Sequence, residues 1–152
     1  MYEAIITDVE TTGNRTPNAR ISEIGSVVLD SRLQEADHFH ILVNPGEEAL
    51  RNAAPEALRK NGISLEEIRA GVPIEEAAAR CQAFLAKYPE AKIHAFNNEF
   101  DKWFLERDPW RVPAQSWGDC IMVTSMEIMN EAGALEIFKN GEPKWPRLDE
   151  AA

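Results

Sequence analysis

Three strand-like segments joined by short connections crowd the first third of the sequence. Residues 2–10 form a short apolar run, residues 20–30 and 36–46 follow it, and the third segment alternates and stops at an Asn-Pro-Gly turn signal. Segments of this kind with short polar links between them are typical of an antiparallel meander. We therefore expect the N-terminal third to form three adjacent antiparallel strands.

Helical patterns then take over. We expect four helices. The first covers residues 54–62, with a Pro near its start and a stop at Gly62, and the second covers residues 74–88, which carry an apolar stripe. The third covers residues 98–107, with aromatics at helical spacing, and the fourth covers residues 119–133, with Asp119 as the expected N-cap. Residues 91–96 form a short buried strand, and residues 144–152 resemble the start of another helix. The pattern predicts an α/β fold in a single domain over residues 1–152.

Composition bears on the size of the domain and on where in the cell we expect it. Its 152 residues suit one domain with a sizeable core, and its 44% hydrophobic and 28% charged content is ordinary for a soluble protein. The sequence has no bilayer-length apolar run and no signal-peptide pattern at Met1, so we expect a cytoplasmic protein without a membrane partner. Cys81 and Cys120 lack metal-type spacing and are interpreted as small buried residues.

The net charge of −10 bears on possible partners. An acidic surface does not steer nucleic acid toward itself, which argues against a protein that passively coats nucleic acid. The charge does not exclude an enzyme whose bound cations neutralise its carboxylates locally.

The first strand ends in the stretch ITDVETTG, which holds Asp8 and Glu10. Residues two apart in a strand point to the same face, so these carboxylates project together. Two carboxylates this close are costly to ionise unless a cation lies between them, and Mg²⁺ or Mn²⁺ prefers such oxygen ligands. The alternative is that both are solvated turn residues or caps.

A second acidic position is Asp101, in the stretch AFNNEFDKWFL. It lies in the first turn of the helix expected after the short strand, where the helix dipole favours a carboxylate. Strand–turn–helix junctions are also where α/β sheets gather ligands. The alternative is that Asp101 is a cap, with Phe100, Trp103 and Phe104 in the core.

Together these stretches resemble a known family. DVETTG is similar to the first motif of the DEDD-type 3′–5′ exonucleases, in particular the DEDDh branch, and FNNEFDKWFL resembles the second motif. The connecting segments NPGEEA and NGISLEEIRAGVPIEEAAARCQAFLA resemble those of the same family, which includes the proofreading subunit of bacterial DNA polymerase III and ribonuclease T. The resemblance covers residues 1 to about 150, with the segments in the family's order.

The resemblance implies an RNase H-like fold, with a mixed five-stranded sheet of an antiparallel meander plus parallel strands and helices on both faces. It implies that Asp8, Glu10 and Asp101 are catalytic and bind two Mg²⁺ or Mn²⁺ ions. It also implies five substrate-binding residues, which are Thr11, Thr12, Phe96, Asn97 and Phe100. Phe96 and Asn61 stand where the family usually has His.

The family's third motif is missing from this sequence. That motif is His, four residues, then Asp, or a Tyr variant, and it supplies the general base and a fourth metal-binding acid. No His follows His94 and no Tyr follows Tyr88. We expect the third motif to lie beyond Ala152, with the helix that carries it.

The implied activity is two-metal hydrolysis of phosphodiester bonds at a 3′ end, which releases nucleoside 5′-monophosphates. The implied partners are 3′ ends of single-stranded DNA or RNA, and a polymerase or another replication or repair protein. One alternative is a catalytically incomplete domain that binds single-stranded ends or docks a polymerase without cutting. Another is a phosphohydrolase of small molecules.

Two weaker features complete the sequence hypotheses. His38 and His40 share one face of the third strand and are interpreted as solvent-side residues rather than a metal site. Arg51, Arg59 and Lys60 form the nearest approach to a basic patch, interpreted as a solvated face rather than a phosphate contact.

Overall fold

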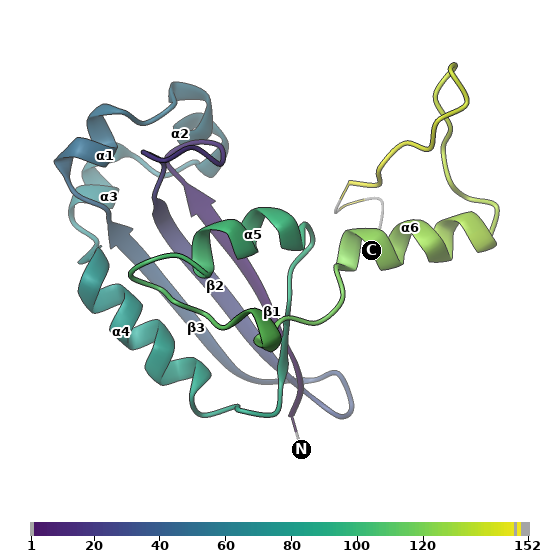
Figure 1. The fold of residues 1–152 in the computed structure, drawn as a ribbon, viewed down its shortest axis with the longest axis horizontal. Helices are drawn as coiled ribbons and strands as arrows, with labels where there is room; N and C mark the ends of the chain where they lie inside the picture. Colours follow the sequence, from purple (N-terminus) through teal and green to yellow (C-terminus); the bar gives the residue numbers. More distant parts are fainter. Residues whose placement is uncertain (1, 148, 150–152) are drawn as a thin grey trace.

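A five-stranded sheet is the centre of the computed structural model, which describes residues 2–147 and 149 (Figure 1). Its long strands are β1 (Tyr2–Thr11), β2 (Ile21–Asp30) and β3 (Glu35–Asn44). β2 pairs antiparallel with both β1 and β3, with Ile24 opposite Val9 on one side and Ile41 on the other. The predicted meander is therefore confirmed.

Two short parallel strands complete the sheet. β5 (Lys92–His94) pairs with β1, and β4 (Val72–Pro73) pairs with β3, so the strand order is β4-β3-β2-β1-β5. This confirms the α/β fold with a mixed five-stranded sheet that the resemblance implied. The sequence did not predict β4, because two residues are too few to show a period of two.

The main core lies on one face of the sheet, under α4 (Ile74–Leu85) and α5 (Asn98–Leu105), which Figure 1 shows on the same side. Alternate residues of β2 are buried, as expected for a strand with one covered face. The predicted stripe on α4 is also confirmed, since Ala77, Ala78, Cys81 and Phe84 are buried.

The opposite face of the sheet departs from the expectation of helices on both sides. Ile6, Val27 and Leu42 are only half-buried there, and His38 and His40 are exposed on the same face, as predicted. The described helix that could have covered this face, α6 (Ile121–Glu131), instead leads away from the sheet (Figure 1). The side chains along this face therefore remain accessible.

Three short helices connect β3 to β4. They are α1 (Glu47–Arg51), α2 (Pro55–Asn61) and α3 (Leu65–Arg69). α2 begins at its Pro and ends at Gly62, whose φ of 67° is the left-handed conformation that favours Gly. The sequence did not predict α1 and α3, because helices of five residues are too short to show an apolar stripe.

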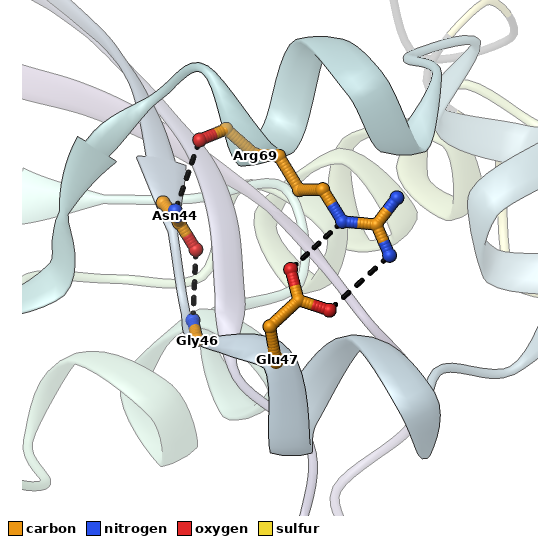
Figure 2. A network of polar contacts seen from close by, with 4 residues as sticks. All are labelled: Asn44, Gly46, Glu47 and Arg69. Atoms are coloured by element: carbon orange, nitrogen blue, oxygen red, sulfur yellow. Dashed lines mark hydrogen bonds and ion pairs between the residues drawn. The ribbon is translucent and has the colours of Figure 1, made fainter.

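A polar network holds this connection against the end of β3 (Figure 2). Asn44 donates from Nδ2 to the Arg69 carbonyl at 2.9 Å and accepts at Oδ1 from the Gly46 N–H at 2.9 Å. Arg69 makes a two-pronged contact with Glu47, at 2.8 Å and 3.2 Å, and this partner holds the pKa of Glu47 below its usual range. The network joins α1 to α3, which flank α2 in the sequence.

The C-terminal part begins with η1 (Ala114–Ser116) and continues through α6. The expected N-cap at Asp119 is wrong: Cys120 occupies that position without a side-chain cap bond, and the Asp119 carbonyl accepts from His94 Nδ1 at 2.9 Å. α6 ends before Gly133, as predicted. Of the further helix expected at 144–152, residues 144–147 are described and are not helical, whereas residues 148 and 150–152 lie outside the described residues.

Two smaller expectations can be compared with the structure. Cys81 is buried as expected, but Cys120 is only half-buried. Within the described part of the chain, no helix combines the length and apolar character needed to cross a membrane.

Candidate active site

The C-terminal half of β1 positions the first two candidate residues. Thr7 and Val9 are buried on one face, while Asp8 and Glu10 project from the open face, as the period of two predicted. Gly25 lies opposite Asp8 in β2 and leaves open space, because a Cβ atom added there would meet no atom within 4 Å. The two carboxylates therefore face a surface that a ligand can approach.

Asp101 reaches the same part of β1 from α5. It is only 3% exposed, and its Oδ1 accepts a hydrogen bond from the Val9 N–H at 3.0 Å. This bond fixes the third acidic side chain beside the residue that separates Asp8 from Glu10, although Asp101 lies 92 residues further along the chain. The structure thus brings together the three acids that the sequence singled out.

The electrostatics of the site favour a cation. Burial, and next the charge of Asp8, raises the pKa of Asp101 to about 7. Burial also raises the pKa of Asp8 and of Glu10, with neighbouring carboxylates as the second cause. Among the described residues no Lys, Arg or His forms an ion pair with these three acids. Uncompensated carboxylate oxygens are a donor set that suits Mg²⁺ or Mn²⁺.

The arrangement is not yet that of a closed metal cage. Over residues 2–147 and 149, no three His, Cys, Asp or Glu side chains are grouped closely enough to hold an ion. One oxygen of Asp101 is instead engaged by the Val9 amide. That these three acids hold an ion therefore stays a prediction, supported by the chemistry of the ligands and by their position.

A cavity of about 320 Å³ opens beside Glu10, between the end of β1 and α2. Two of the five predicted substrate-binding residues, Thr11 and Phe100, line it. Thr11 Oγ1 donates to the Gly13 carbonyl at 2.7 Å, which helps to shape the turn at the cavity wall. Glu10 is the member of the acidic site that lines this cavity, so the cavity and the acidic site are adjacent.

The other three predicted substrate residues do not line this cavity. Thr12 is 2% exposed, and its Oγ1 accepts from the Arg20 N–H at 3.0 Å, so its side chain holds the following loop. Phe96 is half-buried, with its carbonyl accepting from the Met122 N–H at 3.0 Å, and Asn97 is exposed at the N-cap of α5. Their roles in substrate binding stay predictions.

Sequence reasoning missed Glu23, a fourth carboxylate at this site. Glu23 pairs with Glu10 across β1 and β2 and contributes to the raised pKa of both Asp8 and Glu10. His40 Nε2 lies 2.5 Å from Glu23 Oε1, which gives this acid a neighbour on the open face of the sheet. The alternation of residues 20–30 could have placed Glu23 on that face, but only the register shows that it meets Glu10.

Two asparagines also support the site. Asn98 is buried, accepts at Oδ1 from the Ala95 N–H at 2.6 Å and donates from Nδ2 to the Gly118 carbonyl at 2.9 Å, which fixes the turn that leads into α5. Asn61 lines the cavity and donates to the Thr11 carbonyl at 3.0 Å. The sequence singled out Asn61 only as a departure from the family pattern and did not single out Asn98.

Comparison with protein families identifies the class of this chain. A family model described as RNase_T, Exonuclease, matches residues 5–131. The chain therefore belongs to this exonuclease family, which confirms the resemblance to the DEDD-type 3′–5′ exonucleases. No curated protein matches the chain.

Solved structures with a similar fold include E. coli Exonuclease I. Its complex with a dT13 oligonucleotide has a TM-score of 0.74 and 22% identity over 97% of this chain and 34% of that chain. Its complex with a dA16 oligonucleotide has a TM-score of 0.74 and 23% identity over 97% and 34% of the two chains. An ExoI/SSB-Ct complex matches with a TM-score of 0.73 and 22% identity over 98% and 35%. The chain spans about a third of the length of these proteins, and the likeness shows the fold.

Proposed function

We propose that this chain is the nuclease domain of a metal-dependent 3′–5′ exonuclease that removes nucleotides from single-stranded nucleic acid. The observation that carries the proposal is the placement of Asp8, Glu10 and Asp101 near the same part of β1, with Glu10 also lining a cavity to which Thr11 and Phe100 contribute. The family match and the oligonucleotides bound by structures of similar fold support the same substrate class.

In this proposal Asp8, Glu10 and Asp101 would hold Mg²⁺ or Mn²⁺, which would supply Lewis-acid chemistry for the hydrolysis of the phosphodiester bond. The Val9 N–H donates to Asp101 Oδ1 and thereby fixes the orientation of this carboxylate. Thr11 and Phe100 hold the terminal nucleotide in the cavity, with its phosphate toward Glu10. The product is a nucleoside 5′-monophosphate.

The general base is a separate part of the proposal. No His or Tyr follows His94, so the third motif of the family is not in this sequence. We place that motif, with its general base and fourth acid, in a helix after Ala152. A version extended by one helix should cleave at least about 10²-fold faster than residues 1–152, since a general base contributes typically 10²–10⁴-fold. Equal rates would contradict this placement and direct attention to His94.

The test of the proposal is Mg²⁺-dependent release of nucleotides from single-stranded DNA and RNA labelled at the 3′ end, with the extended protein. Asp8→Ala should abolish release without unfolding the protein, and Glu66→Gln, which also removes one negative charge but lies on exposed α3, should act as the parent does. Release by Asp8→Ala at the parent rate would contradict the role of Asp8.

A second candidate function is a domain that binds single-stranded ends without cutting them. It is favoured by the missing third motif and by the absence of a closed metal cage among the described residues. Retained binding of a single strand with no release by the extended protein, at any Mg²⁺ or Mn²⁺ concentration, would establish this function instead.

A further inference from the structure

We propose that the exposed side of α5 and the loop at 13–20 form a track for the single strand behind its terminal nucleotide, leading from the cavity at Glu10 to an arginine-lined groove. The inference rests on the proposed function, because it concerns the same substrate. It adds to that function a second binding region, with Arg20, Arg107 and Trp103 as contact residues.

The groove at the far end has a volume of about 540 Å³ and is open to solvent. It is lined by Pro17, Arg20, Glu106, Arg107, Asp108 and Arg111. Three arginines on one groove stand out in a chain whose net charge is −10. An anionic ligand would therefore find here a positive charge that the carboxylate site lacks.

The groove and the cavity have the same two borders. The loop that follows β1 contributes Gly13 and Asn14 to the cavity and Pro17 and Arg20 to the groove. α5 contributes Phe100 to the cavity, and Arg107, just after the end of this helix, lines the groove. A strand with its end in the cavity could therefore follow this helix directly into the groove.

The side of α5 between them has the composition of a single-strand platform. Phe100 and Trp103 are three residues apart in α5, which places them on one side of this helix, and Arg107 follows two residues after the helix ends. Phe100 and Trp103 pack in part against the core but are only half-buried, so each residue keeps some exposed surface. The Arg107 guanidinium carbon lies 3.7 Å from the centre of the Trp103 ring, which holds its charge on this side.

The arginines differ in how much of their charge is already paired. Arg111 is paired with Asp108. In the described part of the chain neither Arg20 nor Arg107 forms an ion pair. Arg20 Nη1 donates to the carbonyls of Pro17 and Ala19 at 2.6 Å and 2.9 Å, which fixes the guanidinium at the groove. Arg20 and Arg107 are therefore the residues available to phosphates.

Single-stranded nucleic acid is the ligand that fits these features together. Proteins bind it through cations that follow the phosphates and aromatic side chains on which unpaired bases stack. The track holds both elements, with the aromatic residues Phe100 and Trp103 first and the cations Arg107 and Arg20 after them. A paired duplex keeps its bases stacked on one another and cannot use the two rings in this way.

The test is equilibrium binding of a fluorescent single strand of about ten nucleotides, within the site sizes of single-strand-binding folds, measured by anisotropy in EDTA so that no cleavage occurs. Arg107→Ala and Arg20→Ala should each weaken binding several-fold at low salt. Each should also reduce the slope of log K against log salt by about 0.7, the value for one phosphate contact. Arg107→Lys should keep the slope and still weaken binding, since Lys does not stack on Trp103 as Arg does.

Arg80→Ala is the matched control. Arg80 is exposed on α4, is paired with Glu76 and lines neither the cavity nor the groove, so its loss changes the net charge equally. The track would be overturned if both groove variants bound the long strand as Arg80→Ala does, or if a duplex of equal length bound as tightly as the single strand. A parent that cleaved no strand in Mg²⁺ after extension would instead contradict the proposed function.

Discussion

α5 and α6 follow one another along the chain but are held in different ways. α5 is the shorter helix, and it buries Asn98, Asp101, Phe104 and Leu105 against β1 and the core. α6 is longer and rich in Ile, Met and Val, yet none of its residues is buried in the described structure. Apolar content alone therefore does not place a helix, because its apolar side must also meet a partner.

The backbone contacts of the two helices show the same contrast. α5 is held at its start by the bond from Val9 to Asp101 and at its end by the Val112 N–H, which donates to the Leu105 carbonyl at 2.8 Å. α6 is held through its first turn, where the amides of Ile121 and Met122 donate to the carbonyls of Ala95 and Phe96. Local stability should therefore be high in α5 and low in α6.

The largest effect on stability is expected in the core under α5. Phe104 is 4% exposed and contacts the rings of Phe100 and Trp103. Phe104→Ala should lower the free energy of unfolding by about 3–5 kcal/mol, through lost burial and the cavity left behind. Urea denaturation of parent and variant measures this, and a loss below 1 kcal/mol would contradict the role of α5 as a core helix.

The next effect concerns the charge that α5 brings to β1. Burial and Asp8 raise the pKa of Asp101 to about 7, against about 3.9 in an unfolded chain, so the folded protein retains a proton that the unfolded chain loses. Without metal, this group makes the fold less stable as the pH rises from about 4 to about 7, by no more than about 4 kcal/mol.

Asp101→Asn should remove this dependence, because the amide has no charge and its oxygen can still accept from the Val9 N–H. In EDTA the variant should gain stability over the parent between pH 4 and pH 7, with a constant difference above that range. Thermal unfolding of both proteins across these pH values measures the gain. If the difference in stability between the variant and the parent did not change with pH, the pKa of Asp101 would not be raised as described.

A smaller effect is expected where the two helices are linked. Asn98 is bonded to the Ala95 amide and to the Gly118 carbonyl, which lies shortly before α6. Asn98→Ala should cost about 1–3 kcal/mol, because it leaves buried polar groups without partners. Asn97→Ala, at an exposed neighbouring position without a side-chain cap bond, is the control and should cost much less. Equal losses in the free energy of unfolding from Asn98→Ala and Asn97→Ala would contradict the role of Asn98 in joining α5 to the segment before α6.

The smallest effect is expected on α6. Ile128 is 61% exposed, so Ile128→Ser should change the free energy of unfolding by no more than about 0.5 kcal/mol. Amide hydrogen exchange should also be faster in α6 than in α5. A loss as large as that of Phe104→Ala would show that α6 is packed on another surface in solution.

Much of this fold could be predicted from residue patterns. The local signals that the structure confirms are the period of two in the first three strands, Gly62 after α2 and the apolar stripe on α4. The open face of the sheet and the direction of α6 could not be predicted, because both depend on which elements pack against each other in the tertiary structure. The two-residue β4 carries no period at all.

The candidate site was predictable to a similar degree. The spacing of Asp8 and Glu10 and the position of Asp101 after a strand singled out three acids that lie near the same part of β1, and their role as metal ligands stays a prediction. Glu23 was missed because its place beside Glu10 is set by the register of β1 and β2. The structure shows that the Thr12 hydroxyl holds the loop, and its predicted contact with substrate stays a prediction. Arg20 and Arg107 lie far apart in the sequence but line the same groove in the folded chain.

The central claim is that the three acids held together by β1 and α5 bind a divalent cation. The most direct measurement is calorimetric titration of Mn²⁺ into the parent, Asp8→Asn and Glu66→Gln near pH 7. We expect the parent and Glu66→Gln to bind Mn²⁺ with release of protons, because a ligand carboxyl must be ionised and that of Asp101 has a pKa of about 7. Asp8→Asn should bind at least about tenfold more weakly. Equal binding by all three proteins, or no binding by the parent, would contradict the account.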